Sequence, residues 1–170
     1  MVLFRNIIFT ILSICFAMSN EDYIIITISD YAEAAEIISN THSNDSMGVN
    51  KLTTKIIYLD EFQWYNTDND SLAYLIREEI LNHDVQYLLL LGDEQSIPPI
   101  YIMASDGSLQ PSDDFYSCDE AVSTFMNLEN SVPQISTGRI PINSPESAVI
   151  VAEKIHNYMM TPTLGSWRSN

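Results

Sequence analysis

The sequence predicts an α/β fold, a three-layer sandwich in which a parallel sheet is flanked by helices. Segments typical of strands and helices alternate along the chain, as in βαβ units. Residues 87–91 (YLLLL) are also continuously apolar, so both faces of that strand need cover, as they do in the middle of a parallel sheet. Together these two observations favour one α/β domain.

The first half of the chain supplies two strands and one helix. Residues 23–28 (YIIITI) are rich in β-branched side chains and predict a buried strand. Ser29 or Asp30 can cap a helix over residues 31–39. The next residues form a polar loop, and a second strand follows. The inward side chains of this helix are Ala34, Ile37 and Ile38. The polar loop covers residues 40–50, and the second strand covers residues 55–59 (KIIYL).

The second half continues the alternation. Residues 72–83 predict a helix that Asp70 or Ser71 can cap, with Leu72, Leu75, Ile76 and Ile80 at helical spacing. The strand at 87–91 comes next, and residues 134–138 (QISTG) predict a fourth strand. The last helix spans residues 144–160, where Ser144 is the cap and Pro145 fits the first turn.

The charge of the chain excludes one broad class of function. The 170 residues include 23 acidic and 7 basic side chains, a formal charge of −16. Nucleic-acid binding depends on clustered Lys and Arg, and the sequence contains no such cluster. We therefore expect no nucleic-acid partner. The acidic excess serves solubility, or it favours cationic partners or calcium.

Residues 1–20 predict a signal peptide. Arg5 precedes an apolar stretch over residues 7–18, which is too short for a comfortable membrane span. Small residues place a cleavage site after Ser19 or nearby, and an uncleaved anchor or a buried strand is the alternative. Cleavage would leave Cys118 as the only cysteine and no stable membrane span. We expect an exported protein.

Three carboxylates are candidate binding residues. Asp93 follows a central strand, and the carboxyl ends of such strands are where α/β proteins build their sites. It either fixes its own loop, by accepting backbone N–H groups or pairing with Arg139, or contacts calcium or substrate. Asp113 and Asp114, in the segment PSDDFYS, are turn residues and caps or metal ligands. Arg139 itself is expected to form a salt bridge with a nearby carboxylate.

Several motifs in register resemble the gingipain family of secreted cysteine peptidases. They are LLLLGD, PSDDFYS, GRIP, a helix ending in KIHNY, and GSWR, within residues 23–168. The resemblance implies a caspase-like sandwich, bacterial export to the cell surface or the medium, and cleavage of protein or peptide substrates. Residues 21–170 would then be the N-terminal part of the peptidase domain, which is incomplete.

The resemblance assigns no catalytic residue to this chain. Family members use a Cys–His pair in the second part of the domain, and no position here matches either motif. Cys118 could instead pair with one of the three histidines, but the carboxylates near it disfavour a thiolate. We expect none of these four residues to be catalytic: Cys118, His42, His83 and His156.

Two hypotheses for the function remain. The first is the front segment of a secreted cysteine endopeptidase, inactive alone. The second is a non-catalytic extracellular binding module that calcium orders through a carboxylate-rich loop. The carboxylates of that loop are Asp106, Asp113, Asp114, Asp119 and Glu120.

Overall fold

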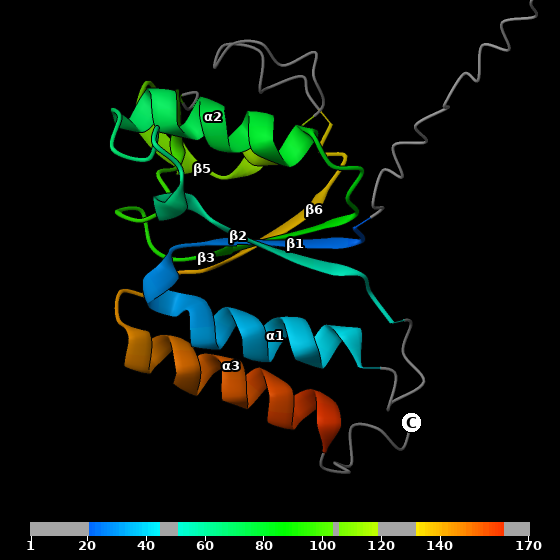
Figure 1. The fold of residues 1–170 in the computed structure, drawn as a ribbon. Helices are drawn as coiled ribbons and strands as arrows, with labels where there is room; N and C mark the ends of the chain where they lie inside the picture. The colour runs from blue at the N-terminus through cyan, green and yellow to red at the C-terminus, as the bar shows by residue number, and fades with distance from the viewer. Residues whose placement is uncertain (1–20, 45–50, 104–105, 119–131, 162–170) are drawn as a thin grey trace, which may run out of the picture.

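The computed structural model describes residues 21–44, 51–103, 106–118 and 132–161. It has three layers, with one parallel sheet between two layers of helices (Figure 1). The predicted fold class is confirmed. The predicted signal peptide lies outside the described residues, and within them no helix is long and apolar enough to cross a membrane.

All four strands of the sheet run parallel, in the order β2-β1-β3-β6. Each of the four predicted strands is present, and the bounds differ from the prediction by two residues at most. Their bounds are Tyr23–Thr27 for β1, Thr54–Tyr58 for β2, Tyr87–Leu91 for β3 and Ser136–Ile140 for β6.

The helices divide between the two faces of the sheet. Helices α1 and α3 pack side by side on one face, and α2 lies on the other (Figure 1). A two-stranded antiparallel sheet, β4-β5, and a short 3-10 helix, η3, belong to the α2 side. The bounds are Ala32–Ser43 for α1, Asn69–Leu81 for α2, Pro145–Met160 for α3, Ile100–Met103 for β4, Leu109–Ser112 for β5 and Asp114–Tyr116 for η3.

One of the three predicted helix caps is confirmed. The Ser144 side chain accepts from Ser147 N at the start of α3. The prediction for α2 was wrong, because Asp68 is the cap and its side chain accepts from Ser71 N at 3.0 Å. The prediction for α1 was also wrong, because Ser29 and Asp30 form a separate 3-10 helix, η1 (Ser29–Tyr31), before α1 begins.

The core consists of two apolar clusters, one on each face of the sheet. Strand β1 is buried at every position, so it contributes to both clusters. Strand β6 is different, because each of its residues is partly or fully exposed. The sheet therefore has a covered centre and an uncovered edge at β6.

Candidate functional site

A tight turn leaves the carboxyl end of β3 and runs beside the end of β6. Gly92 N donates to Ile140 O and Asp93 N donates to Ile142 O, each at 3.0 Å. Gly92 has φ +154°, and a Cβ there would lie 3.1 Å from the Ser96 Cβ. The turn thus needs a residue without a side chain at this position.

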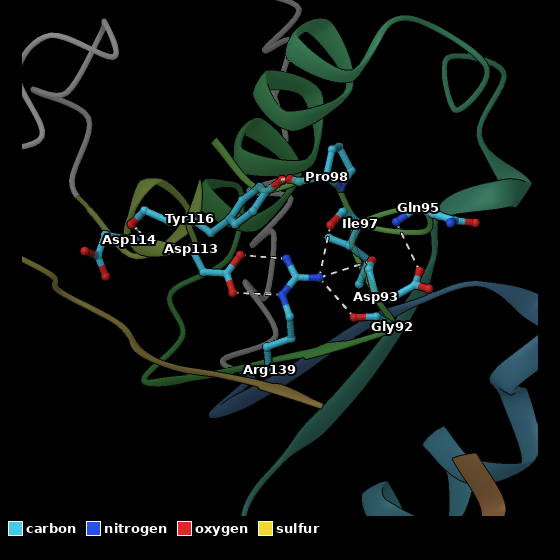
Figure 2. A network of polar contacts seen from close by, with 10 residues as sticks. Gly92, Asp93, Gln95, Ile97, Pro98, Asp113, Asp114, Tyr116 and Arg139 are labelled. Carbon is cyan, nitrogen blue, oxygen red and sulfur yellow. Dashed lines mark hydrogen bonds and ion pairs between the residues drawn. The ribbon is translucent and has the colours of Figure 1, made fainter. Parts of the chain in front are cut away.

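Asp93 fixes the loop that follows this turn. Its Oδ1 accepts from Gln95 N at 3.1 Å and from Ser96 N at 3.2 Å, as in an Asx turn (Figure 2). The same residue's carbonyl accepts from Ile97 N at 2.9 Å. Asp93 therefore accepts backbone N–H groups of its own loop, one of the two loop contacts expected of it, and its contact with calcium or substrate stays a prediction.

Arg139, on β6, forms a two-pronged ion pair with Asp113. Its Nε donates to Asp113 Oδ2 at 2.8 Å and its Nη2 donates to Asp113 Oδ1 at 2.6 Å (Figure 2). The expected salt bridge is confirmed, and its partner is Asp113. A fork of this kind fixes orientation as well as distance, because both groups are planar.

The remaining contacts of Arg139 go to the loop after β3. Its Nη1 lies 3.0 Å from Gly92 O, 3.2 Å from Asp93 O and 3.0 Å from Ile97 O. One guanidinium therefore holds three segments together: β6, the loop after β3, and the turn that carries Asp113. We refer to Arg139, Asp113 and residues 92–97 as the Arg139 cluster.

The η3 turn is held from two further directions. The Tyr116 hydroxyl donates to Pro98 O, and burial raises the pKa of Tyr116, so the hydroxyl keeps its proton. On the other side, Arg77 Nε donates to Phe115 O at 3.0 Å and its guanidinium lies over the Phe115 ring. The turn therefore has a fixed position between α2 and the sheet.

A depression of about 210 Å³ lies beside the Arg139 cluster. The exposed side chain of Glu94 contributes to its rim. The Arg139 guanidinium and both Asp113 carboxylate oxygens in this depression are already engaged with each other. Its lining residues are Glu94, Pro99, Pro111, Ser112, Asp113 and Arg139.

The three candidate carboxylates do not come together around one point. Asp93 and Asp113 lie on opposite sides of Arg139, and Asp114 points away from both (Figure 2). Asp114 is exposed. Among the residues that the structure describes, no group of three His, Cys, Asp or Glu side chains is placed to hold a metal ion. Calcium binding at these residues therefore stays a prediction, and Asp119 and Glu120 lie outside the described ranges.

The other residues considered for catalysis are Cys118 and the three histidines, and they lie in separate parts of the fold. Cys118 is 1% exposed, and its carbonyl accepts from Arg77 Nη2 at 3.3 Å. His42 was expected in a polar loop, but α1 continues to Ser43, so His42 lies on its last turn against Tyr23. His83 follows α2 and contacts Glu21. His156 is half-buried on α3.

Sequence reasoning missed the role of Arg77 and the identity of the Arg139 partner. A signal for Arg77 was present, because a charged residue interrupts the inward stripe of α2 between Ala73 and Ile80. No comparable signal links Asp113 to Arg139, which are 26 residues apart in the sequence.

Comparisons with known proteins agree with this architecture. The sequence profile of peptidase family C25 matches residues 17–170. No curated protein matches the chain.

Three solved structures share the fold. Dimeric latent PorU from Porphyromonas gingivalis is 17% identical with a TM-score of 0.66, and the match covers 88% of this chain and 17% of that one. The Arg-specific cysteine proteinase gingipain R is 18% identical with a TM-score of 0.53, covering 82% of this chain and 28% of that one. A structure described as a protease is 18% identical with a TM-score of 0.58, covering 81% and 28%.

The chain thus spans between 17% and 28% of the length of the structures it resembles. The profile match, in contrast, extends over nearly all of the sequence. On that match, the chain belongs to peptidase family C25, the gingipain family.

Proposed function

We propose that this chain is the N-terminal part of a secreted bacterial cysteine endopeptidase of the gingipain type. Its catalytic Cys and His would lie in a further part of the domain, so the chain alone does not cleave peptides. Its role is that of a scaffold, which fixes the loops at the carboxyl end of the sheet. Protein or peptide substrates would be bound together with the remaining part.

The exposure of β6 is the observation that carries this proposal. Strands of parallel sheets are normally covered on both faces. Strand β1 meets this rule, whereas Ser136 and Gly138 on β6 are exposed and the residues between and after them are only partly covered. A further part of the domain packed against β6 would complete the sheet, in agreement with the small share of the solved peptidases that the chain covers.

The Arg139 cluster supports the scaffold role. In α/β sheets, ligands bind outside the carboxyl ends of the strands, and Arg139 fixes two loops at this end. All three of its guanidinium nitrogens already donate to protein acceptors, so its role is to position these loops. Residues 1–20 support export, because they have the charge and length of a signal peptide.

An activity assay of the isolated chain tests the proposal. We expect no cleavage of a fluorogenic peptide library, with or without a thiol reductant. Thiol-dependent cleavage that Cys118→Ser abolishes would contradict the proposal, since the nucleophile would then lie in this chain. The coding sequence downstream of Asn170 is a second test, which should continue in frame and encode a His and a Cys that follow buried strands.

A further inference from the structure

The surface between α1 and α3 is hollowed, on the face of the sheet opposite α2. The hollow has a volume of about 430 Å³. One wall belongs to α1 and the other to α3, the two helices that lie side by side in Figure 1. Its lining residues are Ile37, Asn40, Glu153, His156 and Asn157.

A hydrogen bond at this hollow fixes the tautomer of His156. The Thr41 hydroxyl donates its proton to Ile37 O at 2.6 Å, so it can only accept at its other contact, His156 Nδ1 at 2.9 Å. His156 Nδ1 therefore carries the proton and Nε2 carries the lone pair. Metal-binding histidines are typically oriented in this way, by a hydrogen bond from the nitrogen that does not bind the metal.

The other two histidines have different surroundings. His83 contacts Glu21 through Nδ1 and Lys55 Nζ through Nε2, each at 3.0 Å, so both ring nitrogens are engaged. His42 packs edge-on against the Tyr23 ring. Among the described residues, no hydrogen bond is found at His156 Nε2, and His156 lines this hollow.

Oxygen donors accompany His156 in the hollow. Glu153 precedes it by three residues on α3, so the two side chains are neighbours on one face of the helix. Asn40 and Asn157 add amide oxygens from the two walls. A formal charge of −16 further favours a cation.

We propose that His156 and Glu153 bind a divalent transition-metal ion in this hollow, with Zn²⁺ as a fitting example. Imidazole nitrogen and carboxylate oxygen are ordinary zinc ligands. Two strong ligands leave coordination positions of the metal ion for water or for Asn40 and Asn157. The metal ion can therefore exchange, unlike one in a closed structural centre. The site uses none of the residues of the Arg139 cluster, and its test does not depend on peptidase activity.

Calorimetric titration of the whole chain with zinc chloride tests the site. We expect binding that is lost in His156→Ala and in Glu153→Gln, but retained in the matched controls His83→Ala and Glu146→Gln. Absence of binding to the unmodified chain at millimolar zinc, or binding that persists in His156→Ala, would overturn the proposal. Circular dichroism establishes that each variant is folded before the titration.

The orienting role of Thr41 is tested separately. Thr41→Val keeps the size of this buried side chain and removes the acceptor for His156 Nδ1. We expect the zinc affinity to fall about tenfold, the lower end of the range for a lost outer contact of a metal ligand. The ¹⁵N shifts of the imidazole should show a protonated Nδ1 for His156 in the metal-free chain. A protonated Nε2 or an unchanged affinity would refute the orienting role.

Discussion

The two ends of the parallel sheet are held by different kinds of polar cluster. At the carboxyl end, Arg139 contacts one carboxylate and three backbone carbonyls. At the amino end, His83 lies between side chains: Glu21 Oε2 at 3.0 Å, Lys55 Nζ at 3.0 Å and Glu79 Oε1 at 3.6 Å.

The difference shows where the molecule needs fixed geometry. The contacts of Arg139 with three main-chain carbonyls set the path of the loop itself. The contacts of His83 named above go to side chains and not to the main chain. They give a partner to the carboxylate of Glu21, which is 7% exposed. Arg139 thus contacts the main chain of the loop at the end where α/β proteins bind ligands, whereas the contacts of His83 at the opposite end go to side chains.

Substitution of Arg139 should have the largest effect. Arg139→Met removes the ion pair and leaves Asp113 and the loop carbonyls without their donor. We expect the free energy of unfolding to fall by about 3 kcal/mol in urea denaturation. Arg139→Lys should recover little, because an ammonium cannot reproduce the fork. If Arg139→Lys kept most of the original stability, the carboxyl end of the sheet would require a positive charge and not the geometry of the guanidinium.

His83→Leu should have a smaller effect at the amino end. Glu21 is buried and loses the hydrogen bond from His83, so we expect a loss of about 2 kcal/mol in the free energy of unfolding. Lys55→Met is the control, since Lys55 contacts the other ring nitrogen of His83, Nε2, at 3.0 Å. If His83→Leu costs more than Arg139→Met, the contrast between the two ends is refuted.

Asp93→Ala should cost still less. It removes the acceptor for Gln95 N and Ser96 N, a contact equivalent to a helix cap and worth about 1 kcal/mol. Asp93→Asn keeps an acceptor oxygen and should be close to the original stability. Equal losses in both variants, measured by thermal unfolding, would mean that the negative charge is needed, as it would be for a bound cation.

The smallest effect concerns pH and His42. Burial lowers the pKa of His42 from its usual 6.5, so protons bind the unfolded chain more readily than the folded one. The contribution of His42 to the free energy of unfolding is therefore fully present above the pKa of the unfolded chain. It is lost as the pH falls from there to the lower pKa of the folded chain. His42→Phe keeps the ring contact with Tyr23 and should make the unfolding free energy less dependent on pH from about pH 7 to about pH 5. Identical slopes for both chains would contradict this assignment.

The regular part of the fold could be predicted because its signals are local. Continuous apolar runs identify parallel strands such as β1 and β3, amphipathic spacing identifies α1 and α2, and a cap followed by proline identifies α3. The β4-β5 pair was missed because β5 (LQPS) contains a proline and is almost wholly exposed, so it has neither an alternating pattern nor strand propensity. The caps of α1 and α2 were predicted at the wrong residues. A separate 3-10 helix precedes α1, and α2 begins at Asn69, earlier than predicted.

The sequence predicted which residues lie at the site, but not which carboxylate pairs with Arg139. The position of Asp93 after a central strand indicated a functional edge, and a salt bridge was expected for Arg139. Which carboxylate it contacts depends on the path of the chain between β3 and β6, which brings Asp113 over the sheet. No pattern in the sequence encodes that path.

The position of Arg139 in the chain also determines when the carboxyl-end loops can become ordered during synthesis. Its partners Gly92, Ile97 and Asp113 precede it by 47, 42 and 26 residues. The strands β1 to β3 can pair as soon as they leave the ribosome, since domains begin to fold from the N-terminus. The loops at residues 92–97 and 113 lack their common donor until β6 emerges. A nascent chain that ends before Arg139 should therefore be cut by proteases in these loops, and a slightly longer one should resist.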